Sequence, residues 1–125
     1  MKTFLYAIAA LGLSATVASA DPVTGTWKTQ PGETGGYAHV NITTCGDTIC
    51  GTIQKVVGNG NSSSEGKRII WNMKADGGGK YSGGKIWAPD NDKTYNSRMT
   101  LKGNTLEVKG CVLGLCRGQN WTRIN

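Results

Sequence analysis

The sequence has few of the side chains that carry most enzyme chemistry. Histidine occurs once, at His39, and there is no GxSxG, HExxH or strong P-loop pattern. Asp90 and Asp92, in APDND, lack the other ligands of an EF-hand loop and are typical of a turn between strands. We therefore predict a protein that is not an enzyme and that holds no cofactor or metal ion. An enzyme that uses His39, or Asp90 with Asp92, is the alternative.

Long hydrophobic runs are also missing. The apolar run over residues 4–13 is shorter than the roughly 20 residues that a membrane span needs. It follows Lys2 and precedes Ala18-Ser19-Ala20, a small-residue pattern typical of signal-peptide cleavage. The pattern predicts a secretory signal peptide over residues 1–20 and one domain over 21–125, periplasmic or secreted. An exported domain of this kind is not expected to bind nucleic acid or to contain a transmembrane segment.

Cysteine is scarce, and its number is even. Four cysteines form two Cys-x4-Cys pairs, and in an oxidising compartment they predict two disulfides with three connectivities open. The local pairing, Cys45 to Cys50 and Cys111 to Cys116, is favoured because each pair would bracket a short hairpin loop. A four-cysteine zinc site is the alternative, although structural zinc sites usually space their paired ligands more tightly.

No stretch after residue 20 has the 3.6-residue period of an amphipathic helix. Short segments with alternating apolar residues are separated by turns rich in glycine, asparagine and aspartate. The predicted strands cover residues 23–29, 37–43, 49–57, 68–74, 80–88, 93–101, 105–112 and 117–123. Tight turns between all neighbours predict an all-β fold, a single small eight-stranded antiparallel up-and-down barrel with two local hairpin disulfides.

The first and last strands supply the residues expected to close this barrel. Arg117, Gln119, Trp121 and Arg123 alternate in the last strand, so their side chains share one face. Antiparallel pairing with the first strand would bring Trp27 close to Trp121 and Arg123. We predict that Trp27, Trp121 and Arg123 form the closure.

The interior is expected to hold aromatic and polar side chains together. Trp71, Trp87, Tyr95 and Trp121 lie on four strands and alternate toward the inner face. The polar side chains expected to share that face are those of Arg117, Gln119 and Lys85. Buried charges need partners, so a cation on this face favours a mouth that meets a ligand. We predict a site for a small amphipathic or anionic ligand, or an envelope component, lined by Trp71, Trp87, Tyr95, Arg117 and Gln119.

Three alternatives stay open. A slip in alternation at the paired glycines 83 and 84 would turn Ile86 inward and Trp87 outward. The aromatic side chains would otherwise fill the barrel, giving a solid envelope interaction or structural protein that acts through its outer surface. Without Lys2 that surface has 13 basic against 8 acidic side chains, an excess that attracts anionic polymers or lipids, although scattered lysines are also typical of a plain solvated surface. The polar loop 58–66 is a connector or a lid.

Four segments in order carry a family resemblance: GTWKT, CGDTICGTI, GGKIWAPDNDKTY and GCVLGLCRGQNWTR. Together they resemble the small exported bacterial proteins grouped as domain of unknown function 2147, over essentially all of residues 21–125. The family name implies no activity. The resemblance implies a lipocalin-like barrel, and Trp27 and Arg123 are similar to the calycin arrangement in which a first-strand tryptophan packs beneath a last-strand arginine. That contact would contribute about 1 kcal/mol of cation–π attraction.

Overall fold

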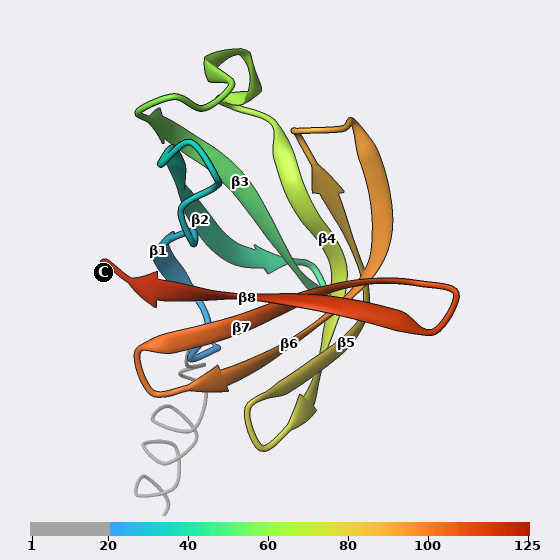
Figure 1. The fold of residues 1–125 in the computed structure, drawn as a ribbon. Coiled ribbons are helices and arrows are strands. Elements are labelled where there is room, and N and C mark those ends of the chain that lie inside the picture. The colour runs from blue at the N-terminus through green and yellow to red at the C-terminus, as the bar shows by residue number, and fades with distance from the viewer. Residues whose placement is uncertain (1–20) are drawn as a thin grey trace, which may run out of the picture.

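The protein is a closed eight-stranded antiparallel barrel (Figure 1). The structure, a computed structural model, describes residues 21–125, and the predicted signal peptide lies outside the described residues. Each strand pairs with the next in sequence, and β8 returns to pair with β1, which confirms the predicted up-and-down topology. The strands are β1 (Gly25–Lys28), β2 (Tyr37–Cys45), β3 (Thr48–Val57), β4 (Arg68–Gly77), β5 (Lys80–Ala88), β6 (Lys93–Lys102), β7 (Thr105–Val112) and β8 (Leu115–Arg123).

The described residues contain little helix. A single 3-10 turn, η1 (Ser62–Ser64), interrupts the connection between β3 and β4. No helix in residues 21–125 has the length and hydrophobicity needed to cross a membrane.

Both disulfides join neighbouring strands, as predicted. Cys45 bonds to Cys50 at the β2–β3 hairpin, and Cys111 bonds to Cys116 at the β7–β8 hairpin, so the zinc alternative is wrong. Cys111 and Cys116 are also direct partners in the strand register. Because a shift of one residue would separate such partners, the Cys111–Cys116 bridge stabilises the register of its hairpin.

The first and last strands meet over a short seam, and this confirms their predicted pairing. Trp27 is opposite Arg123 in the register, and the guanidinium carbon of Arg123 lies 4.4 Å from the centroid of the Trp27 ring. The Trp27 side chain is fully buried, and its indole N–H donates to the carbonyl of Val23 over 2.9 Å. The Arg123 guanidinium donates to the carbonyls of Pro22 (2.7 Å) and Thr24 (3.1 Å). One side chain therefore holds the N-terminal segment against the C-terminal strand.

Residues 21–24 fold beneath this end of the barrel. The carboxylate of Asp21 accepts hydrogen bonds from the Tyr81 hydroxyl (2.5 Å) and from the backbone N–H of Val23 (2.9 Å). Tyr81 is 3% exposed and Val23 is fully buried. Burial first, and then the hydrogen bond to Asp21, raises the pKa of Tyr81 well above its usual range. This end of the barrel is therefore closed and packed.

The core extends upward from the seam. Alternation places Met99 on β6 and Val108 on β7 inside the barrel. The largest fully buried side chains are Trp27, Trp121, Ile42, Ile53, Ile70, Met73, Leu106, Val23 and Val40.

Two extra residues break the alternation in β4 and β5. Asn72 and Gly83 both have positive φ, 56° and 75°. Asn72 lies where β4 has one residue more than β3, and Gly83 lies where β5 has one residue more than β6. Because an extra residue reverses the faces of the side chains beyond it, the buried residues of β4 are Ile69, Ile70 and Met73, which do not follow simple alternation. The predicted inward direction of Trp71 is therefore wrong, because its side chain lies on the outer face.

The connections alternate between the two ends of the barrel. The β1–β2, β3–β4, β5–β6 and β7–β8 connections lie at the end opposite the packed segment 21–24, because each strand reverses the direction of the chain. Figure 1 shows the β3–β4 loop and the β5–β6 hairpin standing at the top of this end. It also shows the β7–β8 hairpin projecting sideways beyond the barrel wall.

Replacing Trp27 with alanine should lower the free energy of unfolding by about 3 to 5 kcal/mol, because it removes a fully buried ring and leaves Arg123 without its partner. Trp71→Ala is the matched control, since Trp71 is a half-buried residue of the outer face and should cost clearly less. Chemical denaturation followed by far-ultraviolet circular dichroism measures both losses. Equal losses would contradict the closing role of Trp27.

Alkaline pH should destabilise the protein through Tyr81. Its pKa is raised in the folded state, so its contribution is complete below the unfolded value of about 10 and is lost as pH rises above that value. Tyr81→Phe removes this group, so its unfolding free energy should fall less steeply above that pH than that of the wild type. Denaturation curves at a series of alkaline pH values measure the two slopes, and parallel slopes would refute the prediction.

Candidate ligand-binding cleft

A cleft of about 820 Å³ opens at the end of the barrel opposite the packed segment. This volume is within the range of sites that hold small molecules, roughly 300 to 1,000 Å³. Its floor is apolar and is formed by side chains of five strands, namely Ile53, Ile69, Ile86, Val108 and Trp121. The barrel is therefore filled at one end and hollow at the other.

Two loops form one side of the mouth. The β1–β2 loop contributes residues 29–34 and the β3–β4 loop contributes residues 59–61. The Asn59 side-chain amide donates to the carbonyl of Thr34 over 3.3 Å. A Cβ atom on Gly36 would lie 2.7 Å from the backbone nitrogen of Gly60, so only glycine allows the loops to approach this closely. The loop 58–66, predicted as a connector or a lid, is thus part of the wall.

Polar side chains of β8 stand above the apolar floor. Trp121 is 1% exposed, and its indole N–H donates to the Oε1 atom of Gln119 over 2.9 Å, which leaves the Gln119 amide nitrogen as a donor. Arg117 follows Gln119 on the same face of β8 toward the mouth, and its side chain is exposed. Within residues 21–125 its guanidinium makes no ion pair. Glu33 and Asp90 also line the cleft. From the interior to the mouth, β8 therefore presents the buried indole of Trp121, then the amide of Gln119, then the unpaired guanidinium of Arg117.

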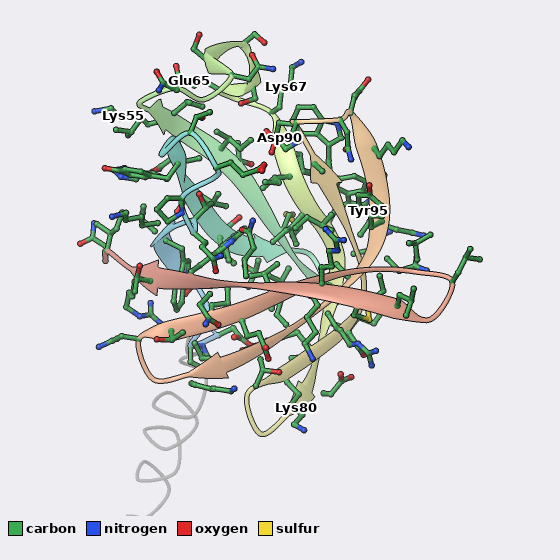
Figure 2. All side chains as sticks on the ribbon, viewed as in Figure 1. Lys55, Glu65, Lys67, Lys80, Asp90 and Tyr95 are labelled. Atoms are coloured by element: carbon green, nitrogen blue, oxygen red, sulfur yellow. A yellow bond between two sulfur atoms is a disulfide. The ribbon has the colours of Figure 1, made fainter. Side chains whose placement is uncertain are left out.

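A smaller side groove of about 480 Å³ adjoins the cleft. Gly110 and Arg117 line both spaces, so Arg117 stands where they meet. Tyr95 faces the groove, and its hydroxyl accepts a hydrogen bond from the Asn91 amide over 3.0 Å. In Figure 2, Asp90 lies at the open end of the barrel with Lys67, whereas Lys80 lies at the opposite end. The groove is completed by Val112 and Leu115 of the β7–β8 hairpin.

The structure brings together only part of the predicted ligand-binding set. Arg117, Gln119 and Trp87 line the cleft, Tyr95 lines the adjoining groove, and Trp71 lies outside on the outer face, paired with Lys85. The prediction that Trp71 lines the ligand-binding site is therefore wrong. The extra residues in β4 and β5 turn its side chain to the outer face.

Trp87 reaches the cleft in a different way from the one predicted. The bulge at Gly83 turns Ile86 inward, opposite Tyr95, and leaves Trp87 on the other face of β5, as the slip alternative stated. The Trp87 ring stands at the rim, where its indole N–H donates to the Asp92 carboxylate over 2.8 Å and Lys67 Nζ lies 5.5 Å from the ring centroid. Trp87 therefore forms part of the rim and not of the floor.

Trp121 lies nearer the open end of the barrel than Trp27 and Arg123, the other two residues predicted to close it. It pairs with Leu106 across β7 and β8 and lines the cleft, whereas Trp27 and Arg123 meet each other at the seam below. Trp121 thus separates the packed end from the open end.

The side chains considered for catalysis are engaged in ordinary contacts. His39 is on β2 between Lys28 and Lys55 in the register, and its ring centroid is 5.8 Å from that of Tyr37. Asp92 accepts the Trp87 hydrogen bond in the β5–β6 turn. Within residues 21–125 no three histidine, cysteine or acidic side chains gather in a way that could hold a metal ion.

The predicted ligand-binding set did not include the residues of the floor. Alternation in the strands is enough to place Ile53 and Val108 inside, whereas Ile86 lies inside only because of the bulge in β5. The first loop, residues 29–34, contains Pro31 and Gly32, which predict a turn, and carried no signal for a binding wall.

Comparisons with known proteins agree with this architecture. The sequence profile of a family described as "Uncharacterized protein conserved in bacteria (DUF2147)" matches residues 25–123. A solved structure, protein HP1028 from the human pathogen Helicobacter pylori, is described as belonging to the lipocalin family. It superposes with a TM-score of 0.70 and 17% sequence identity over 86% of this chain and 85% of that chain. At this identity the likeness shows the fold alone.

No curated protein matches the sequence significantly. The family match covers all eight strands, and the structural match has the same barrel. The chain belongs to the DUF2147 family of uncharacterised bacterial proteins and has the lipocalin-like fold.

Proposed function

We propose that this protein is an exported carrier that binds a small amphipathic molecule with an anionic head group in the cleft. The observation that carries the proposal is the order of side chains along β8, from buried Trp121 through Gln119 to the unpaired Arg117. An apolar tail fits the floor, and a head group then lies at the height of Arg117. Lipocalin-like barrels hold one small ligand in the same position.

The apolar floor supplies the binding free energy in this proposal. Burial stabilises a bound chain by about 0.8 kcal/mol per methylene group, so a tail of several carbons is bound mainly by contact with Ile53, Ile69 and Val108. The open cleft also argues against the alternative of a solid barrel that acts only through its basic outer surface.

Arg117 supplies selectivity for the head group. A guanidinium forms two parallel hydrogen bonds with a carboxylate, sulfate or phosphate, and these become stronger when the tail excludes water. Glu33 and Asp90 line the same mouth, so a head group with several negative charges is disfavoured. We therefore propose a ligand with a single negative charge.

Two features support the location and the absence of catalysis in this proposal. Disulfides persist in oxidising compartments, and both pairs of cysteines are bridged, as expected after export of residues 21–125 by a signal peptide over residues 1–20. The residues that line the cleft include no histidine and no cysteine, the side chains most often used as a general base or a thiol nucleophile.

Replacing Arg117 with glutamine should weaken binding of dodecanoate about tenfold or more, because a hydrogen bond to a charged group contributes about 1.5 to 3 kcal/mol. Arg98→Gln is the matched control, since it removes the same charge from the outer face of β6. Isothermal titration calorimetry measures both. The proposal fails if the wild type does not bind dodecanoate, or if the two variants bind it equally well.

Replacing Gly110 with valine tests the volume of the site separately from its charge. Gly110 lies between the cleft and the groove, where an added side chain would contact Ile86 and Tyr95. We expect Gly110→Val to weaken binding of dodecanoate and of uncharged decanol alike, whereas Arg117→Gln should weaken only dodecanoate. Calorimetry with both ligands, on variants whose melting temperature matches the wild type, shows the difference. Unchanged binding by Gly110→Val would exclude this part of the cleft from the site.

A further inference from the structure

The β7–β8 hairpin ends in three exposed aliphatic side chains. Val112 is 53% exposed, Leu113 is 97% exposed and Leu115 is 76% exposed. We call these three residues the apolar tip. The hairpin that carries them projects beyond the barrel wall (Figure 1), so the apolar tip is held away from the core. The Cys111–Cys116 disulfide fixes the two strands directly behind it.

The backbone does not favour leucine at the end of this hairpin. Leu113 and Gly114 form the two-residue turn and have positive φ values of 51° and 82°. This type of turn is normally occupied by Asn-Gly, because a bulky side chain is strained at positive φ. Leu113 is therefore exposed to water and strained at the same time. Residues that break local rules without a gain in stability are typical of functional positions.

The other hairpins show that the apolar tip is not a consequence of the fold. The β2–β3 hairpin has the same Cys-x4-Cys spacing, but its turn is Gly46-Asp47. The β4–β5, β5–β6 and β6–β7 hairpins turn through glycine, asparagine, aspartate and proline, at residues 78–79, 89–92 and 103–104. A disulfide-linked hairpin in this barrel therefore does not need apolar residues at its end.

The apolar tip is continuous with the binding site. Val112 and Leu115 line the side groove, and Arg117 stands between this groove and the cleft. Alternation places Leu115 on the same face of β8 as Arg117, Gln119 and Trp121. The inner wall of the barrel thus extends past the mouth to the end of the hairpin.

We propose that the apolar tip docks on the surface of a lipid bilayer that contains anionic lipid, and that the side groove is the route by which an amphiphile passes between bilayer and cleft. The second part rests on the proposed function. Docking of the tip does not, because it depends only on the exposed residues of the hairpin.

Size and charge favour a bilayer over a protein partner. A stable protein interface buries about 800 Å² on each side and is rich in aromatic residues, whereas the apolar tip is three aliphatic side chains on a projecting turn. A bilayer accepts such a tip without a complementary pocket. Arg98, Lys109 and Arg117 lie beside the hairpin, with Arg98 Nη2 3.3 Å from Cys116 Sγ, and cations near a membrane surface are attracted to anionic lipids. Binding by so small a group is weak and reversible, as exchange of a ligand requires.

The double variant Leu113→Asn with Leu115→Thr tests docking without disturbing the fold, because asparagine suits positive φ and threonine suits a strand. The purified protein is sedimented with vesicles of phosphatidylcholine and phosphatidylglycerol in equal amounts. We expect the wild type to bind and the double variant to partition about tenfold more weakly or worse, with a melting temperature no lower than the wild type. Adding Asp47→Leu to the double variant controls for general hydrophobicity and should not restore binding.

Three results would overturn the docking proposal: wild-type protein that does not bind the vesicles, a double variant that binds as well as the wild type, or sedimentation velocity that shows a dimer which the double variant abolishes. The last result would assign the apolar tip to a second copy of the chain. Calorimetry with dodecanoate in the absence of vesicles separates this failure from that of the proposed function. Wild-type protein that binds dodecanoate but not vesicles refutes docking alone.

The route through the groove has its own readout. Transfer of a dansyl-labelled fatty acid from vesicles to the protein should be slower for the single variant Leu113→Asn, while its calorimetric affinity for dodecanoate stays at the wild-type value, because Leu113 lines neither the cleft nor the groove. Equal transfer rates would refute the route.

Discussion

The barrel depends on one contact between residues almost a hundred positions apart. β1 has four residues and meets β8 over a two-residue register, so backbone hydrogen bonds alone form a weak seam. Arg123 strengthens it by stacking on the Trp27 ring and by donating to two carbonyls of the N-terminal segment. A cation–π contact contributes about 1 kcal/mol, but burial of Trp27 beneath it contributes more. These side-chain contacts therefore add to the backbone hydrogen bonds that join Thr26 to Ile124 and Asn125, and together they close the sheet.

Closure at this end explains why the site is at the other. Trp27 and the segment 21–24 fill the barrel near the seam, and Tyr81 and Asp21 join the same packed end. The β1–β2, β3–β4 and β5–β6 connections at the opposite end carry mainly glycine, proline and polar residues that do not fill the interior, so the floor stops at Trp121 and the space above it stays open. The position of the cleft thus follows from where the chain places its bulky side chains.

The sequence was sufficient for the strands, the closed topology and both disulfides, because alternation, turn residues and cysteine spacing are local signals. The sequence did not predict which way a side chain points where that direction depends on the pairing between strands. The bulge at Asn72 and Gly83 reverses two strands together, and asparagine at positive φ has no pattern that distinguishes it from a residue of a regular strand. Trp71 was therefore placed inside when it lies outside. Arg117 and Gln119 were placed correctly because β8 has no bulge before them.

The regular register of β8 also connects the cleft to the end of its hairpin. With no bulge between Trp121 and Leu115, every second side chain stays on the inner face, so the sequence of indole, amide, guanidinium and leucine forms one continuous wall. The Cys111–Cys116 bridge joins β7 to β8 in the part of the hairpin that extends beyond the neighbouring strands. A hairpin that only closed the fold could end at Arg117. This one continues through strained, exposed leucine, and the proposed docking on a bilayer accounts for this extension.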